Sequence, residues 1–485
     1  MFYTTRSFAP LCPSLAPLFS PFFAVLALSL AIGGCTTPPI APATSLAIPS
    51  AWHSDAVTAT DKENETAAWW RKAGNPELCE LIEQALRNNR DLHAAAARVL
   101  QARALAGEAD SELQPQLNGV AAARRGRDTL LDPRSTSVRA GLQASWEADL
   151  FGAKELASQA AQLDSEHAEL ARLGMETVIA AEVATSYLDA AILTRRIRLG
   201  EQYLDKLDQA TRIAGKQFDA GRLSRPEVLM RERQRKAARI EQTNLESALQ
   251  QRLYQLSVLV GVPAGWLNPQ FPELDNLKIP PPAFTLPGEL LERRPDVQQH
   301  LRVVNAEAAR LGVSQRELYP RLAFTWDNSQ ERARIDGSNA TRGVALGYGV
   351  TLTLPILDGG RIRSRIQVSE ARLTEAMANY EKAMLDALAD AETVLLREKT
   401  AATTVTLSEE ALKLAEEGTA QALRLFQAGQ ADRGRVIDSE QAHLRMRDAY
   451  QQALGAHWTA SVDILRAFSG PIDTFRAPTE TRSSL

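Results

Sequence analysis

The chain repeats one long unit in tandem, and this repeat constrains the fold more than any other feature. The word ELQPQL at residues 112–117 returns as ELYPRL at residues 317–322, 205 residues later. Further along, QFDAGRLSRPEV from Gln217 matches LFQAGQADRGRV from Leu425 in a frame of Phe, Ala-Gly and Val. A 485-residue chain suggests about three domains by length alone. The likeness instead predicts two copies of one unit of roughly 200 residues, too long for a solenoid repeat.

The N-terminus is typical of an exported protein. Arg6 precedes the apolar run FFAVLALSLAI, and Gly33, Gly34 and Cys35 follow it. The run is shorter than the ~20 residues of a membrane-spanning helix, and small residues after such a run are typical of signal cleavage. We therefore expect a signal peptide at residues 1–34. The Pro-, Ser- and Thr-rich stretch that follows predicts an extended tether over residues 35–70.

The sequence IGGC resembles the bacterial lipobox, which implies cleavage before Cys35 and acylation of its thiol. A non-lipidated signal with a chance cysteine is the alternative. Thr36 stands where lipoproteins held at the inner membrane carry Asp, so the outer membrane is the expected location. With Cys12 removed and Cys35 acylated, Cys79 has no partner for an intramolecular disulfide, and stability must come from packing and assembly.

Composition argues against nucleic-acid binding and catalysis. The chain has 55 basic and 59 acidic residues and a pI near 6.0, without a basic patch for nucleic acid. Its six histidines are scattered, and neither a nucleophile elbow nor a phosphate loop occurs. We expect no enzyme activity, no metal site and no cofactor.

Each copy contains a predicted β-hairpin. Residues 137–150 and 344–356 alternate apolar with polar or small residues at a period of two, which is typical of a strand. Weaker candidate strands precede them at residues 117–127 and 321–329. The clearest strands are close to the ~9–11 residues that cross a bilayer when tilted. A half-buried sheet on a soluble core is the alternative, but four strands cannot close a barrel in lipid. Several chains would have to combine their strands.

Long helices flank the hairpins. Residues 76–113 and 286–318 have helical spacing, and Pro115 and Pro320 mark helix-to-strand hinges because proline removes a backbone donor and disfavours helix before it. Residues 153–220 and 361–428 lack proline, and each predicts a helix of ~100 Å at 1.5 Å per residue. Ala-Gly turns at Gly221 and Gly429 lead into shorter return helices at residues 226–260 and 436–468. A free-standing coiled coil is the alternative for the heptads of the second long helix.

Together, the lipobox, the duplication, hairpins entered at L-x-P-x-L and turns of the form F-x-x-G resemble the outer membrane factor family, the TolC and OprM type, and most closely its NodT-type lipoprotein branch. The resemblance implies an α+β membrane protein. It implies that three chains form one 12-stranded β-barrel that continues into a periplasmic α-helical barrel. It also implies a passive efflux conduit for small molecules such as drugs, working with a periplasmic adaptor and an inner-membrane pump of the RND type. A lipid-anchored trimeric stalk or adhesin without transport is the alternative.

The domain boundaries expected are a first copy at residues 71–267, a Pro-rich linker at 268–285, a second copy at 286–470 and a tail at 471–485. The resemblance implies that the turns dock the adaptor; the residues concerned are Gly221, Arg222, Leu223, Gly429, Gln430 and Ala431. It also places Asp438 as an acid lining the closed tip, with Arg435 where TolC carries a second acid. A local surface ion pair between Asp438 and Arg435 is the alternative to a gate.

Overall fold

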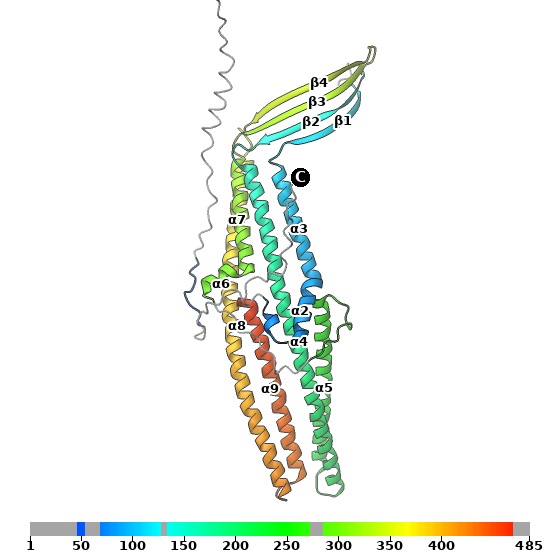
Figure 1. Cartoon of the computed structure of the whole chain (residues 1–485), viewed down its shortest axis with the longest axis vertical. Coiled ribbons are helices and arrows are strands. Elements are labelled where there is room, and N and C mark those ends of the chain that lie inside the picture. Colours follow the sequence, from blue (N-terminus) through cyan, green and yellow to red (C-terminus); the bar gives the residue numbers. More distant parts are fainter. Residues whose placement is uncertain (1–45, 54–67, 128–132, 272–284, 469–485) are drawn as a thin grey trace, which may run out of the picture.

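The computed structural model describes residues 46–53, 68–127, 133–271 and 285–468. The predicted signal peptide, Cys35 and the C-terminal tail lie outside these residues. Helices run along the long axis of the molecule, and a β-sheet lies at one end (Figure 1).

The two copies have the same order of elements. The first contains the 3-10 helix η1 (Trp69–Lys72), α2 (Pro76–Asn88), α3 (Arg90–Ser111), β1 (Gln116–Gly126), β2 (Ser135–Ala148), α4 (Ala153–Asp219) and α5 (Arg225–Val260). The second contains α6 (Pro287–Arg293), α7 (Pro295–Arg316), β3 (Arg321–Ile335), β4 (Thr341–Thr353), α8 (Arg361–Gln427) and α9 (Arg433–Phe468). Helices, hairpin, long helix and return helix therefore recur in the predicted order.

The helix before each hairpin is broken near its start, so the prediction of single helices over residues 76–113 and 286–318 is wrong. Asn89 separates α2 from α3; its side-chain oxygen accepts from the backbone N–H of Asp91 and Leu92, and its amide donates to the Leu259 carbonyl at 2.9 Å. Arg294 separates α6 from α7 with an extended ψ of 120°, as expected for a residue before proline. The break at Arg294 has a local cause in the proline that follows it, whereas the break at Asn89 also involves the distant Leu259 carbonyl.

The two predicted hinges lie between helix and strand. α3 ends at Ser111 and β1 begins directly after Pro115, while α7 ends at Arg316 and β3 begins directly after Pro320. The repeated proline word therefore marks the point where each copy passes from the helices to the sheet.

Both hairpins join one antiparallel sheet with the strand order β1-β2-β3-β4. β2 pairs with β3, which links the two copies, and Trp146 lies opposite Phe324 with their rings stacked 5.6 Å apart. β3 continues to Ile335, whereas the sequence pattern predicted an end at residue 329. The predicted strand ended early because the polar Asn328 and Gln330 interrupt the apolar alternation. In the described chain neither β1 nor β4 has a partner on its outer edge.

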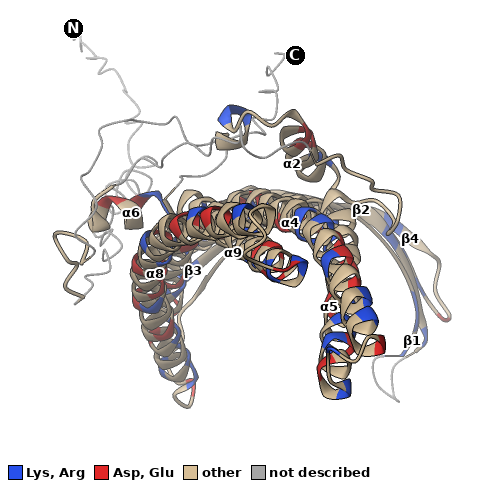
Figure 2. Ribbon diagram, turned by 90° about the horizontal axis from the view of Figure 1, so that it is seen from below, with Lys and Arg blue, Asp and Glu red and all other residues tan. Residues whose placement is uncertain are grey.

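The long helices α4 and α8 each have 67 residues and are ~100 Å long at 1.5 Å per residue. Contacts link α8 to α9, α9 to α4, and α4 to α5, and these four helices follow one another along a curved layer (Figure 2). The largest core cluster surrounds the middle of α4, where Trp70 and Tyr187 are fully buried. α4 also contains a window apolar enough to span a membrane; 61% of it is buried here, which accounts for its apolar character without a lipid contact.

Part of the predicted tether packs against the second copy. The Trp52 indole donates to the Thr285 carbonyl at 2.8 Å, and its ring meets Phe468 edge-on with centroids 5.5 Å apart. The backbone N–H of His53 donates to Glu392 on α8 at 2.6 Å. Of the tether predicted over residues 35–70, residues 46–53 are therefore held against the second copy, while residues 35–45 and 54–67 lie outside the described residues.

Candidate functional site

The turns at Gly221 and Gly429 have the same construction. Gly221 has φ 70° and Gly429 has φ 73°, in the left-handed region. The N–H of Arg222 donates to the Gln217 carbonyl at 2.8 Å, and the N–H of Gln430 donates to the Leu425 carbonyl at 2.9 Å. This is the hydrogen bond of a Schellman motif, which satisfies helix C-terminal carbonyls. An added Cβ would meet no atom within 4 Å at either glycine, so the backbone angle alone requires glycine.

A cation–π contact closes each turn. The Arg225 guanidinium lies 5.9 Å from the centre of the Phe218 ring, and Arg433 lies 5.9 Å from that of Phe426. This contact was not predicted from the sequence, although a Phe followed seven residues later by Arg occurs in both copies. The contact fixes how each return helix leaves its turn.

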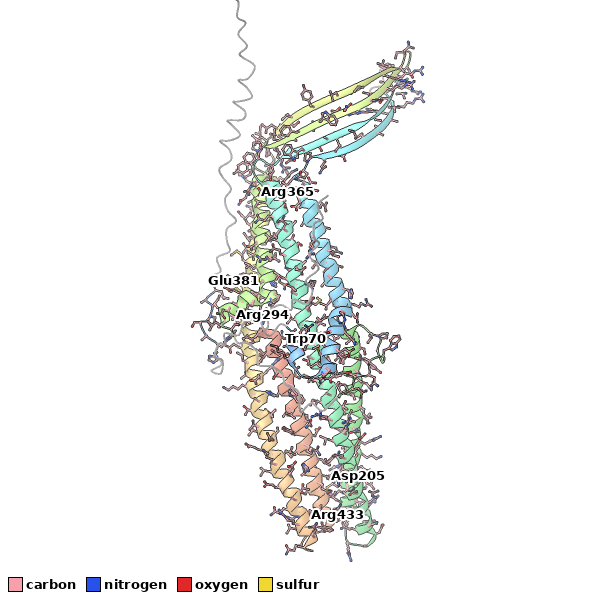
Figure 3. The ribbon with its side chains drawn as sticks, viewed as in Figure 1. Trp70, Asp205, Arg294, Arg365, Glu381 and Arg433 are labelled. Carbon is pink, nitrogen blue, oxygen red and sulfur yellow. The ribbon has the colours of Figure 1, made fainter. Side chains whose placement is uncertain are left out.

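Both turns lie at the end of the molecule farthest from the sheet; Arg433 marks this end in Figure 3. Arg222 and Gln430 are exposed, and Leu223 and Ala431 are half-buried. The six residues predicted to dock a partner therefore lie together in two adjacent turns at one end. Their geometry would suit contacts with another protein along the helix axis.

Asp438 does not form the local ion pair considered from the sequence. Its carboxylate accepts two hydrogen bonds from Arg231 on α5, at 2.8 and 3.2 Å. Within the described residues no ion pair joins it to Arg435, whose backbone N–H is instead capped by Asp432 at 2.8 Å. Asp438 thus connects the return helices of the two copies close to the turns. Sequence reasoning could not find Arg231, because 207 residues separate it from Asp438.

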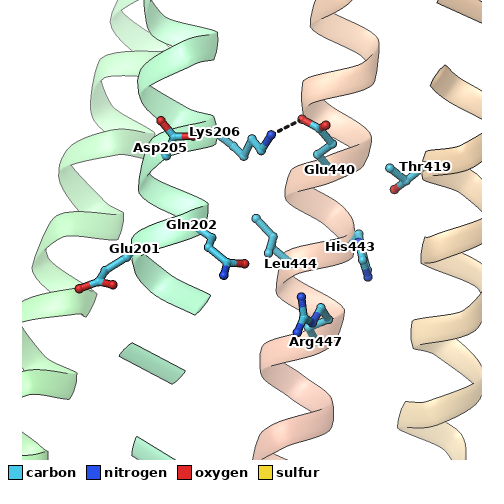
Figure 4. A pocket seen from close by; sticks show the side chains of 9 residues that line it. All are labelled: Glu201, Gln202, Asp205, Lys206, Thr419, Glu440, His443, Leu444 and Arg447. Carbon is cyan, nitrogen blue, oxygen red and sulfur yellow. Dashed lines mark ion pairs between the residues drawn. The ribbon is translucent and has the colours of Figure 1, made fainter. Parts of the chain in front are cut away.

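Further polar contacts join α4 to α9 above this pair. Lys206 on α4 lies 2.9 Å from Glu440 on α9, beside a cavity of about 600 Å³ that is also lined by His443 and Arg447 (Figure 4). Farther from the turns, Arg196 on α4 binds Asp448 on α9 at 2.8 and 3.2 Å. The seam between the two copies is therefore polar near the turns and apolar at the core around Tyr187.

No group of three or more His, Cys, Asp or Glu residues suited to a metal ion occurs in the described part of the chain. Cys79 is a half-buried free thiol, and burial together with the nearby Glu83 raises its pKa. The notable chemistry of the site is ion pairing between helices rather than a convergent set of acids, bases or ligands.

The sequence profile of the family described as "Outer membrane efflux protein" matches residues 81–262 and 286–470. The chain belongs to this family. The profile matches in two stretches, one in each copy, in agreement with the duplication seen in the sequence.

Relatives and solved structures agree with membership. The pyoverdine export outer membrane protein OpmQ of Pseudomonas aeruginosa is 31% identical over 372 residues, which cover 74% of this chain and 78% of OpmQ. The outer membrane protein OprJ of the same species is 30% identical over 377 residues, with the same coverage of both chains. The solved outer-membrane channel OprN superposes with a TM-score of 0.78 at 25% identity, over 90% of this chain and 100% of that one. The predicted family and the outer membrane location are confirmed, and the family members found are channels and export proteins rather than enzymes.

Proposed function

We propose that three copies of this chain form a duct across the outer membrane that conducts small molecules passively. The unfinished sheet carries this proposal. One chain supplies four strands with two unpaired outer edges, and lipid does not tolerate open edges. Three copies supply twelve strands, an even number within the range of outer membrane barrels.

The faces of the sheet fit a barrel wall. On β4, one face carries five apolar residues that are each more than 60% exposed; they are Val344, Leu346, Tyr348, Val350 and Leu352. The opposite face carries Gly, Ala and Thr, and its charged residues include Arg139, paired with Asp327 at 3.4 Å. The first face suits lipid and the second a water-filled lumen.

Exposed leucines on α8 supply a seam for the next copy. Leu385, Leu396, Leu407 and Leu414 are 51–69% exposed, and spacings of 11, 11 and 7 residues keep them on one helix face. α8 lies at one edge of the curved layer and α5 at the other (Figure 2). Side-by-side packing of three such layers would bury this face and close a helical tunnel below the barrel.

The end of the tunnel farthest from the sheet would meet the partner proteins. The turns at Gly221 and Gly429 would meet a periplasmic adaptor, which would join the duct to an inner-membrane pump of the RND type. OpmQ is named for pyoverdine export and OprJ as an outer membrane protein. Small exported compounds are the cargo class we propose here, and the pump would select among them.

The N-terminus and the closed end complete the proposal. Acylation at Cys35 would anchor the chain, and Cys35→Ser should abolish labelling by a radioactive fatty acid.

Asp438 and Arg231 would hold the tunnel narrow at the turns, since three copies bring three such pairs toward one axis. The stretches 71–267 and 286–470 are the two structural units of this duct, and residues 268–285 connect them.

Conductance in planar lipid bilayers tests the function. The purified trimer should produce discrete current steps, whereas a trimeric stalk or adhesin would carry no current. Deletion of residues 321–353, the hairpin of the second copy, is the matched control and should abolish the steps. A well-formed wild-type trimer that never conducts would contradict the proposal.

A further inference from the structure

Four arginines lie on the apolar face of the sheet, at the strand ends farthest from the helices. The strand register places Thr136 opposite both Arg125 and Arg334, and Arg332 opposite both Val138 and Arg342. Directly opposed residues share one face of a sheet, as do residues two apart along a strand. All four arginines therefore share a face with the lipid-facing apolar residues described above. We name Arg125, Arg332, Arg334 and Arg342 the outer arginine row.

In the proposed barrel, the length of β4 would place the row at a membrane surface. Ten residues separate Leu352, at the helix end of β4, from Arg342 at its far end. At ~3.4 Å per residue and a strand tilt of ~35–45°, this is a rise of about 24–28 Å. The apolar band of an outer membrane barrel is ~25 Å tall. The row would therefore meet lipid headgroups, in the leaflet that faces away from the periplasmic helices.

Among the described residues, no carboxylate balances the charge of the row. All four arginines are exposed, and none takes part in an ion pair found among the described residues. Arg332 lies directly opposite Arg342, and like charges in this position destabilise a sheet. Arg139, one residue from Val138 but on the other face, has its carboxylate partner in Asp327. The described part of the sheet supplies a carboxylate to the inward Arg139 but none to the four outward arginines, which favours an external anion.

We propose that the outer arginine row binds the phosphate groups of a phosphorylated glycolipid in the outer leaflet, of the lipid A type. Guanidinium groups bind phosphate through two parallel hydrogen bonds, which suits a headgroup carrying phosphates on a sugar disaccharide. In the trimer, β4 of one copy adjoins β1 of the next, which brings Arg342 near the neighbour's Arg125 and continues the row around the barrel. The inference rests on the proposed function, because that function sets the orientation of the sheet in the membrane.

The test measures binding of fluorescent lipid A to the full-length trimer in mixed micelles. Bis-phosphorylated lipid A should bind the wild type more tightly than dephosphorylated lipid A. Loss of one or two charge-assisted hydrogen bonds weakens binding by roughly tenfold or more, so Arg332→Gln with Arg342→Gln should remove this preference. The matched control, Arg124→Gln with Arg139→Gln, removes two arginines at similar height on the inward face. It should keep the preference.

Three results would overturn the inference. They are equal affinity of the wild type for both forms of lipid A, equal loss in the inward variant, and full displacement of lipid A by phosphatidylglycerol or by millimolar inorganic phosphate. The same samples are checked for trimer migration and for conductance. A conducting trimer without the preference overturns the lipid site alone, whereas failure to assemble and conduct counts against the proposed duct.

Discussion

α4 and α8 are the same helix in two copies, with 67 residues each and a left-handed glycine before the first residue, yet they pack very differently. α4 contacts α2, α3, α5, α7 and α9, and most residues in its middle are buried; α8 contacts α6, α7 and α9 and keeps a row of exposed leucines. Duplication supplied two equal helices, and only one became the centre of the folded chain. The other was left with a surface for assembly.

The two helices also differ in chemistry at the same height. Near Val183, α4 packs in an apolar cluster with Tyr187 and Leu188. At the corresponding turn of α8, Asp390 accepts hydrogen bonds from Arg294, the residue directly before α7, and from Arg466 on α9, each at 3.0 Å. The centre of one copy is held by apolar burial and the centre of the other partly by charge.

The largest effect should come from placing a charge in the middle of α4. Val183 is 0% exposed, so Val183→Asp buries an unpaired carboxylate and should cost about 4 kcal/mol or more. We expect little folded protein in membrane fractions. The matched variant Leu396→Asp changes a residue 62% exposed on α8 and should leave the helix content by circular dichroism unchanged while trimers are lost. Equal folding defects in both variants would contradict the contrast.

The next effect should come from Asp390→Asn, which removes the carboxylate that Arg294 and Arg466 share and leaves Arg294 only its pair with Asp296; it should cost ~1–3 kcal/mol. Burial acts to raise the pKa of the Asp390 carboxyl, but Arg466 and Arg294 outweigh it, so this pKa lies below its usual range. A lowered carboxyl pKa contributes stability that is present above the unfolded pKa of about 3.9 and is lost as the pH falls through the folded value.

Thermal unfolding at a series of pH values checks this sign. The difference between wild type and Asp390→Asn should be full near neutral pH and shrink below about pH 4. Burial raises the pKa of the neighbouring Asp463, which acts in the opposite sense, so the comparison of variants is the informative quantity. A difference that grew on acidification would refute the role of Asp390.

Unlike α4 and α8, the two turns should be equally sensitive to substitution of their glycine. Gly221→Val and Gly429→Val force a branched residue into the left-handed region, and each should cost ~1–2 kcal/mol in thermal unfolding. Gly215→Ala is the control: it lies within α4 with open space around it and should stabilise by up to ~1 kcal/mol. A large difference between the two valine variants would show that the turns are not equivalent.

The smallest effect on stability should come from the pair between the copies. Asp438 is 49% and Arg231 25% exposed, and an exposed pair is worth only ~0.2–1 kcal/mol. A double-mutant cycle of Asp438→Asn and Arg231→Gln should therefore leave the unfolding midpoint almost unchanged. If the pair narrows the tunnel, either change should raise single-channel conductance, while Arg435→Gln should not. Unchanged conductance in both would leave the pair as a surface contact only.

Local patterns predicted most of the secondary structure, because the periods of helix and strand and the proline hinges depend on near neighbours. The break at Arg294 was also predictable from the sequence, since Pro295 follows it. The break at Asn89 involves a hydrogen bond to the distant Leu259 carbonyl, which no local pattern indicates. The partner of Asp438 and the join between β2 and β3 depend on residues far apart in sequence. The difference in burial between α4 and α8 depends on their places in the assembled copies, so no local pattern predicts it.

The join between β2 and β3 sets the order in which the chain can complete itself. Ser135 lies opposite Ile335, so β2 must wait for about 200 residues to follow before it meets its neighbour. Pairings so distant in sequence form slowly, and a waiting strand edge is prone to pair with other chains. An exported chain emerging N-terminus first would expose both edges of its first hairpin throughout this delay. Such a chain would depend on a periplasmic chaperone to keep that hairpin from aggregating before the second half arrives.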